Sequence, residues 1–242
     1  YQKQTFVLHV KEKPHLESLA FYSQFRDVFA ENSMVLPCLM KTLSGNLEVD
    51  AGDFYMHVCS FVDGSHLGFL DCVAHSYGYE LGRLHQIFAK QKQMELVALR
   101  KTRARMTELA KTSQALRECS NFPDLNTPSL FEKLICFNPD DLFCDNPQIC
   151  HGDLNMGNVI YTKEKKIAFL DFHDSIESFF DPIYDVATAC LRYCWVRSED
   201  RKQLTDFFLL GYKRATARTF SEEQLKAAAE SYASNGQVTI LW

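Results

Sequence analysis

The amino-acid sequence lacks the features that mark several classes of protein. No run approaches about 18 consecutive apolar residues, the length that a membrane-spanning helix requires. Lys and Arg number 26 against 31 Asp and Glu, a formal net charge of −5, so the basic excess typical of nucleic-acid-binding domains is missing. We therefore expect neither a membrane nor a nucleic-acid partner. A composition that is 46% hydrophobic and 24% charged also excludes disorder, collagen-like repeats and a coiled coil.

Regular cysteine pairs are also missing. The nine cysteines are odd in number and scattered, with no CxxC pair, whereas disulfide-rich secreted domains are shorter and use even spacings. Cys190 and Cys194 stand one helical turn apart, and we expect them to pack on a helix face because free cysteine behaves as a small hydrophobe. No signal peptide is visible in the opening YQKQTFVLHV. These observations favour a reduced, cytoplasmic protein.

Before residue 64 the pattern is that of a small unit of strands and one helix. Alternation and β-branched residues predict a strand over 5–11, and apolar residues at helical spacing predict a helix over 16–29. A turn is expected over 43–50, and a second strand over 54–62. The first strand starts almost at once after Tyr1, so we expect an upstream piece of the fold to precede it.

After residue 64 long helical patterns dominate. The helices are predicted over 67–89, 92–118, 129–136, 181–196, 200–217 and 221–233, with a loop over 138–147 and a β-hairpin made of strands 159–161 and 167–172. The sequence thus predicts a small unit of strands and one helix over residues 1–64, joined to a larger, mostly helical unit over 65–242.

Polar side chains flank the two strands of the predicted hairpin. Asp153 and Asn158 precede its first strand and Asp171 follows its second, so the hairpin brings all three to one edge. One carboxylate and one amide oxygen suit Mg²⁺, and Asp153 then remains to accept a proton. Phosphoryl transfer requires this division between metal ligands and a base. The base of protein kinases also precedes the metal-binding Asn by the spacing that separates Asp153 from Asn158.

Three motifs in this order resemble those of the aminoglycoside phosphotransferase and choline kinase family. They are HGDLNMGN (151–158), FLDFHD (169–174) and DPIYDVA (181–187), and ELGRLH (80–85) is similar to that family's helix ahead of the catalytic region. The resemblance covers nearly the whole chain. It implies an α+β, protein-kinase-like fold with two lobes. The small N-terminal lobe of sheet plus helix (1–64) would bind the nucleotide and end in a hinge, and the larger, mostly helical C-terminal lobe (65–242) would be the catalytic and substrate-binding one.

The resemblance also implies roles for residues of the large lobe. Asp153 would be the catalytic base, and Asn158 and Asp171 would bind Mg²⁺. His151 would brace the catalytic loop by hydrogen bonds, and Asp185 would tie the segment after Asp171 back to that loop.

In the small lobe, the resemblance implies a nucleotide site. Ser60, Phe61 and Val62 belong to SFVDG (60–64), which would be the hinge that contacts adenine, and Glu17 would be the carboxylate of the small lobe's helix. The sequence departs from the family pattern where His9 stands in place of the usual Lys or Arg that grips the α/β phosphates. Lys11 lies on the same strand face and is our candidate substitute. No Gly-rich hairpin that would cover the phosphates is found upstream, in keeping with only 10 glycines in the chain.

The resemblance predicts an enzyme that uses ATP and Mg²⁺ to phosphorylate a hydroxyl of a small molecule. Similar proteins act on aminoglycosides, choline, homoserine, methylthioribose and fructosamines, and the compact helical insert over 92–136 is slightly more like the homoserine or choline branch. His173, Asp174 and Glu177 are candidates on the substrate side, where carboxylates would pair with a cationic amine.

Two other classes remain open at this point. His151, Asp153, Asp171, His173 and Asp174 also read as the ligands of a metal-dependent phosphohydrolase. That interpretation leaves Asn158 and the hinge-like segment without a role. A nucleotide-binding pseudokinase is the third reading, motivated only by His9.

Overall fold

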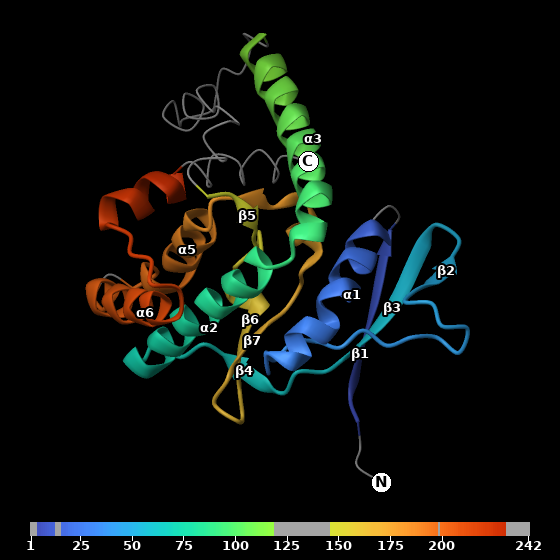
Figure 1. The fold of residues 1–242 in the computed structure, drawn as a ribbon, viewed down its shortest axis with the longest axis horizontal. Helices are drawn as coiled ribbons and strands as arrows, with labels where there is room; N and C mark the ends of the chain where they lie inside the picture. Colours follow the sequence, from blue (N-terminus) through green and yellow to red (C-terminus); the bar gives the residue numbers. More distant parts are fainter. Residues whose placement is uncertain (1–3, 13–15, 119–145, 198, 231–242) are drawn as a thin grey trace.

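The computed structural model describes residues 4–12, 16–118, 146–197 and 199–230. At its N-terminal end an antiparallel sheet has the strand order β1-β3-β2. These elements and one helix, α1, are together called the small lobe (Figure 1): β1 (Phe6–Glu12), α1 (Leu16–Glu31), β2 (Val49–Ala51) and β3 (Phe54–Ser60). The strands predicted over 5–11 and 54–62 and the helix over 16–29 are confirmed.

Strand β3 has one buried face and one exposed face, as its alternating sequence requires. Tyr55, His57 and Cys59 are buried on the inner face, whereas Phe54 is exposed. Leu19 of α1 joins Tyr55 and Cys59 in a small apolar core between the helix and the sheet. The inner face of this sheet therefore faces the rest of the molecule. His9 of β1 and His57 of β3 lie on this face.

The opposite side of α1 belongs to the core of the large lobe. Phe21, Phe25 and Phe29 are buried together with Phe88 and Phe172. Edge-to-face and stacked ring pairs link them, with the centroids of Phe25 and Phe88 5.0 Å apart. Because α1 contributes to both cores, it fixes the small lobe against the large one.

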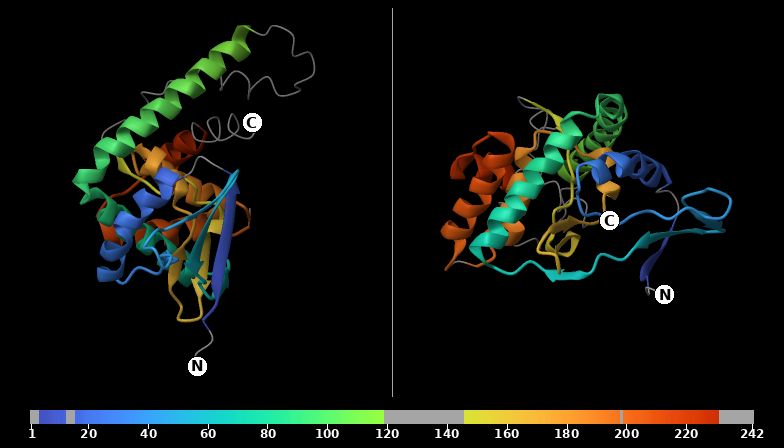
Figure 2. Two further views of the ribbon diagram at one scale, coloured as in Figure 1. Left: turned by 90° about the vertical axis from the view of Figure 1, so that its right-hand side faces the viewer. Right: turned by 60° about the horizontal axis from the view of Figure 1, so that its bottom comes forward.

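The large lobe, the described chain after β3, is mostly helical (Figures 1 and 2). Its helices are α2 (Asp71–Ala89), α3 (Lys92–Glu118), α5 (Ile183–Ala189), a π-helical turn η4 (Cys190–Cys194), α6 (Arg201–Thr216) and a helical stretch over 222–230. Helix α2 packs along α6. Gly78 and Gly211 permit the close approach, because a Cβ on Gly78 would lie 1.9 Å from the carbonyl oxygen of Phe208.

Short strands place the polar loops of the large lobe. Strands β4 (Gly64–His66), β6 (Val159–Thr162) and β7 (Ile167–Phe169) form one antiparallel sheet, and β5 (Gln148–Ile149) pairs with β8 (Phe179–Phe180). Short 3₁₀ turns follow at η2 (Met156–Asn158) and η3 (His173–Glu177). The hairpin β6–β7 is as predicted. Strand β4 was not predicted, because its three residues are all exposed and show no alternation.

Some of the remaining sequence predictions concern described residues, and others lie outside the described ranges. Helices predicted over 67–89, 92–118, 181–196 and 200–217 are present, although the π-helical turn interrupts the third. Cys190 and Cys194 are buried on that turn, as expected for packing residues. The helix expected over 129–136, most of the loop over 138–147 and the end of the helix over 221–233 lie outside the described residues. No described helix is long and apolar enough to cross a membrane.

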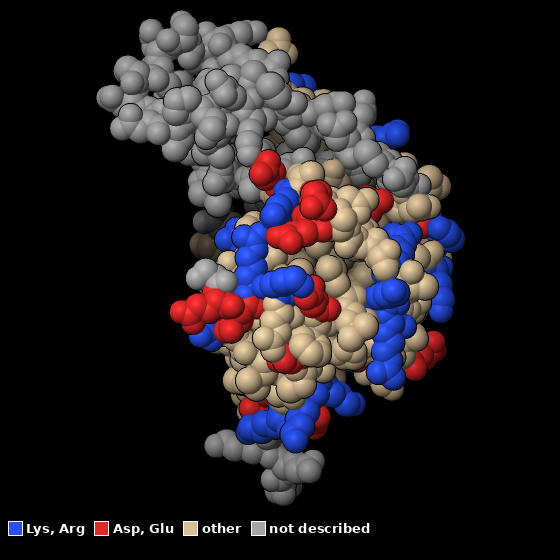
Figure 3. Space-filling view, turned by 90° about the vertical axis from the view of Figure 1, so that its left-hand side faces the viewer, with Lys and Arg blue, Asp and Glu red and all other residues tan. Residues whose placement is uncertain are grey.

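Charges of both signs share the surface on the side of α5 and α6. Figure 3 shows basic and acidic side chains interspersed over that face, without a broad patch of one sign. Ion pairs between Lys202 and Asp206 and between Lys226 and Glu222 illustrate the mixing. This face therefore resembles an ordinary solvated surface rather than a polyanion-binding one.

Candidate active site

The loop that connects β5 to β6 carries the first motif, and a buried carboxylate holds its start. Asp185, on α5, is 1% exposed and accepts hydrogen bonds from the backbone N–H of His151 at 2.7 Å and of Gly152 at 3.0 Å. Gly152 has a φ of +87°, and a Cβ there would lie 2.1 Å from Oγ of Ser178. The position thus requires glycine both for its backbone conformation and for space.

The same carboxylate is anchored from the far side of the lobe. Nε2 of His85 on α2 lies 3.0 Å from Oδ2 of Asp185, and Nδ1 of His85 lies 2.8 Å from the hydroxyl of Tyr212 on α6. Burial by itself raises the pKa of Asp185, but the hydrogen bond and charge of His85 and the His151 contacts outweigh it and hold the pKa below its ordinary value. Asp185 is thus an ionised, fully paired brace of the catalytic loop.

His151 is also a brace rather than a reactive group. Its Nε2 donates to the carbonyl oxygen of Leu170 at 2.9 Å, and its Nδ1 accepts from the backbone N–H of Asp153 at 3.3 Å. Burial lowers the pKa of His151, so the ring is neutral with the proton on Nε2. Because both ring nitrogens are engaged, His151 does not serve as a metal ligand in this arrangement, which weakens the metallohydrolase interpretation.

Two side-chain amides hold the Asp153 carboxylate. Nδ2 of Asn155 donates to Oδ2 of Asp153 at 2.8 Å, and Nδ2 of Asn158 donates to the same oxygen at 2.9 Å. A further bond from Nδ2 of Asn158 reaches the Asp153 carbonyl at 2.9 Å. Oδ1 of Asp153 is thus left to accept a proton from outside the loop. The amide orientation also turns the oxygen of Asn158 away from Asp153.

Asp171 follows β7 in a backbone conformation that few residues adopt. Its φ is +55°, in the left-handed region where Asp and Asn are enriched, and its side chain is 46% exposed. The next residue, Phe172, is buried and stacks on Tyr22 of α1 with ring centroids 5.1 Å apart. That anchor in the core directs the Asp171 carboxylate outward, where Nε2 of His173 lies 3.8 Å from its Oδ1.

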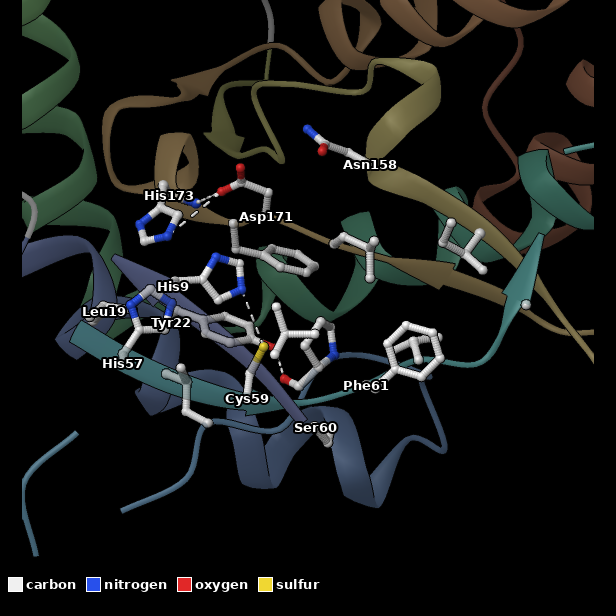
Figure 4. Close-up of a pocket in the computed structure, with 18 residues that line it drawn as sticks. His9, Leu19, Tyr22, His57, Cys59, Ser60, Phe61, Asn158, Asp171 and His173 are labelled. Carbon is white, nitrogen blue, oxygen red and sulfur yellow. Dashed lines mark hydrogen bonds and ion pairs between the residues drawn. The ribbon is translucent and has the colours of Figure 1, made fainter. Parts of the chain in front are cut away.

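A cavity of about 360 Å³ opens between the two lobes. Figure 4 shows Asn158 and Asp171 on one side of it, with the side chains of β1 and β3 facing them. The predicted site residues that line it come from both lobes: His9, Ser60, Phe61, Val62, Asn158, Asp171 and His173. Asp153 lies just behind its wall, hydrogen-bonded to Asn158.

The small lobe presents two stacked histidines to this cavity. His9 and His57 are cross-strand partners, and their rings lie 4.6 Å apart at 4°. Burial lowers the pKa of His9, with the Lys11 charge adding to the effect, and burial together with the neighbouring histidines lowers the pKa of His57 to about 4. Both imidazoles are therefore mostly neutral at pH 7, unlike the Lys or Arg of the family pattern.

Besides His151, Asp153 and Asp185, four further predicted site residues lie outside the cavity wall. Glu17 is exposed and forms an ion pair with Lys101 of α3, so the structure does not bring it to the nucleotide side of α1. Lys11 lies two residues beyond His9 on β1 and pairs across the sheet with Tyr55. Glu177 faces Arg105 at 3.8 Å. Asp174 lies beneath the catalytic loop, where burial raises its pKa, opposed by Arg105 and reinforced by Asp153.

A family model agrees with this architecture over most of the chain. The model of the phosphotransferase enzyme family matches residues 1–225. The chain belongs to that family. This match confirms the predicted family. It also confirms that this phosphotransferase is an enzyme of the predicted class. A comparison with curated protein sequences gives no match.

Solved structures share the fold of this phosphotransferase at low sequence identity. The aminoglycoside phosphotransferase APH(3'')-Id from Streptomyces rimosus superposes with a TM-score of 0.59 at 12% identity, covering 95% of this chain and 85% of the other. Spectinomycin phosphotransferase APH(9)-Ia, in complex with ADP and spectinomycin, gives 0.55 at 13% identity, with 96% and 73% covered. Choline kinase LicA from Streptococcus pneumoniae gives 0.50 at 14%, with 96% and 87% covered. The predicted α+β, protein-kinase-like fold is confirmed.

The sequence analysis assigned no role to two residues of the candidate site of this phosphotransferase. His57 belongs to no motif, and the alternation of Tyr55, His57 and Cys59 along β3 was the one signal that pointed it inward. His85 was quoted within ELGRLH without a role, and only the fold shows it against Asp185, 100 residues away in sequence.

Proposed function

We propose that this protein transfers the γ-phosphoryl group of ATP, with Mg²⁺, to a hydroxyl of a small molecule such as an amino alcohol, an amino acid like homoserine, or an aminoglycoside. The observation that carries the proposal is the Asp153 carboxylate. Both amide donors bind Oδ2, which leaves Oδ1 as the oxygen that would accept the proton of an attacking hydroxyl. Positioned proton transfer of this kind contributes about 10²–10⁴-fold to a rate.

The residues around the base fit a magnesium ion. Asn158 donates through its amide nitrogen to Asp153, so that its oxygen is the atom left for a ligand role, and the exposed Asp171 carboxylate shares the same cavity wall. Hard oxygen donors of this type are those that Mg²⁺ prefers. A bound Mg²⁺ would neutralise charge on the nucleotide phosphates. Asn158 and Asp171 are the residues that would hold it.

The remainder of the cavity suits a nucleotide. Ser60, Phe61 and Val62 line it at the end of β3, in keeping with a hinge that contacts adenine through its backbone. At the phosphate end the neutral His9 supplies no fixed positive charge, which leaves Lys11 as the cation of that strand face. We expect His9→Ala to change nucleotide affinity less than Lys11→Ala, measured by calorimetric titration with Mg²⁺·ATP analogues.

We place the acceptor beside Asp174 and Glu177, two carboxylates that also have Arg105 near them. Asp174 lies beneath the catalytic loop close enough for the charges of Asp153 and Asp171 to affect it. An ammonium group on the acceptor would be attracted to this cluster. We therefore favour an acceptor that carries an amine, in keeping with the aminoglycoside phosphotransferase and the choline kinase that share this fold. Asp174→Asn is expected to raise the KM for such an acceptor more than it changes kcat.

The test is ADP release with Mg²⁺·ATP across a panel of amino alcohols, sugars and aminoglycosides. Turnover with one acceptor should fall by at least about 10²-fold in Asp153→Asn while nucleotide affinity survives. Asp53→Asn, in the exposed turn between β2 and β3, is the matched control and should keep wild-type turnover. Full activity in Asp153→Asn would refute the assignment of the base.

Asp171→Asn separates metal binding from the base. It is expected to weaken Mg²⁺-dependent nucleotide binding and to leave Mg²⁺-independent binding unchanged, because only the first uses the carboxylate. Calorimetric titrations with and without Mg²⁺ measure the difference. Equal Mg²⁺-dependent affinity in the variant and the wild type would contradict the ligand role.

The neutral histidine pair favours one second candidate, a nucleotide-binding pseudokinase. Its signature is ATP binding without ADP release on any hydroxyl acceptor. Restoration of turnover by His9→Lys would show that a catalytic machinery is present and lacks only the cation.

A further inference from the structure

Three histidines from both lobes meet at the phosphate end of the cavity. His9 stacks on His57 with ring centroids 4.6 Å apart, and His57 lies 5.8 Å from His173. Nε2 of His173 in turn lies 3.8 Å from Oδ1 of Asp171. The four side chains form a continuous chain from β1 and β3 to the segment after β7, as Figure 4 shows.

One member of this cluster is energetically unsatisfied within the described structure. The His57 side chain is 4% exposed, and its Nδ1 is buried without a hydrogen-bond partner. A buried polar atom without a partner destabilises the folded chain. Such an atom in a native protein calls for a reason, of which an absent ion is one.

We propose that His9, His57, His173 and Asp171 form a binding site for a divalent transition metal ion such as Zn²⁺. Three imidazoles and one carboxylate are a donor set typical of zinc, whereas Mg²⁺ takes oxygen ligands. Hydrogen bonds from neutral imidazoles to phosphate are also weaker than those from charged donors such as Lys or Arg. The cluster is therefore better suited to a metal ion than to direct contact with an anion.

Binding requires these side chains to move together, because in this arrangement their donor atoms do not lie within 4.8 Å of one another in groups of three. Nitrogen ligands of tetrahedral zinc stand about 3.4 Å apart, given Zn–N bonds of about 2.0–2.1 Å. The parallel rings of His9 and His57 must tilt toward each other at their cavity edge to reach that spacing. His9 is half-buried, and moving its ring gives up a weak contact with Sγ of Cys59 at 3.5 Å and part of the stack on His57.

An ion at this site would join the two lobes and compete for Asp171. His9 and His57 belong to the small lobe, whereas His173 and Asp171 belong to the large lobe. If Asp171 is the magnesium ligand of the proposed kinase, Zn²⁺ should inhibit phosphoryl transfer in competition with Mg²⁺·ATP. This consequence rests on the proposed function, but the binding of the ion does not.

The binding test uses Co²⁺ as a spectroscopic probe on the metal-free full chain without nucleotide. We expect one equivalent to bind with the strong visible absorption of a tetrahedral site. His57→Gln and His9→Gln should each weaken the affinity at least tenfold. The matched control is His66→Gln on the exposed strand β4, which should bind Co²⁺ as the wild type does.

Two measurements keep the outcome clear. Thermal melting of each metal-free variant establishes that it is folded, and His9→Gln provides the test if His57→Gln is not. Equal Co²⁺ affinity in wild type, His9→Gln and His57→Gln would overturn the proposal, as would an octahedral spectrum in the wild type. Zn²⁺ inhibition that is relieved in His57→Gln would extend it to the enzyme. Absence of kinase activity with Co²⁺ bound as expected would refute the proposed function alone.

Discussion

Two histidine clusters lie on either side of the catalytic loop, and they differ in how completely their polar groups are paired. Behind the loop, His85 and His151 surround the buried Asp185, and every ring nitrogen has a partner within hydrogen-bond distance. In front of it, His9, His57 and His173 face an open cavity, and Nδ1 of His57 has no described partner. A closed network of this kind stabilises a fold, whereas an open one is suited to a ligand.

We expect the largest loss of unfolding free energy where the closed cluster loses the charge of Asp185. In Asp185→Asn one carboxylate oxygen becomes an amide that faces the donors of His151, Gly152 and His85. Breaking a buried charged network costs about 3–5 kcal/mol of unfolding free energy. Chemical denaturation measures this cost. Asp171→Asn is the contrast from the open cluster, and its exposed side chain should change stability by no more than about 0.5 kcal/mol.

We expect a smaller loss of unfolding free energy at Gly152, in the tight turn of the loop between β5 and β6. Gly152→Ala combines left-handed strain of about 1–2 kcal/mol with a collision against Ser178. Gly45→Ala has a similar φ of +86° but no atom within 4 Å of its new Cβ, so it incurs only the first cost. The difference between the two unfolding free energies isolates the collision. Equal values would mean that the loop relaxes around the methyl group.

The pH dependence of the unfolding free energy tests the closed cluster through His151. Burial lowers the pKa of His151 in the folded chain, so between its unfolded value of about 6.5 and that lowered value the unfolded chain binds more protons. Stability is therefore fully present above about pH 6.5 and falls as the pH is lowered, by up to about 1.4 kcal/mol per pH unit. Denaturation of His151→Gln should show a shallower fall, and His66→Gln the wild-type one.

The smallest effect is expected at Glu17. Its carboxylate is exposed and pairs with Lys101 on α3, away from the cavity. Glu17→Gln should therefore leave both the melting temperature and the nucleotide affinity nearly unchanged. A large loss of nucleotide affinity would show that Glu17 turns inward when nucleotide binds, which would restore the role that the family resemblance implied.

Local patterns were sufficient for most of the fold that the structure describes. Strands β1, β3, β6 and β7 and helices α1, α2, α3 and α6 follow alternation or helical periodicity, which are properties of neighbouring residues. Strand β4 could not be found in this way, since three exposed residues become a strand only by pairing with β6. The π-helical turn after α5 likewise has no sequence signal in the periodicity of its segment.

By itself the sequence determined the order of the motifs, and with it the loop that holds Asp153 and Asn158, because both lie within one short segment beside a hairpin. Only the tertiary structure decided which distant residues join them. Asp185 and His85 are 100 residues apart, and His57 lies on a strand of the other lobe from His173. Contacts of this kind depend on how α1, α2 and the two sheets pack, which no local pattern of residues records.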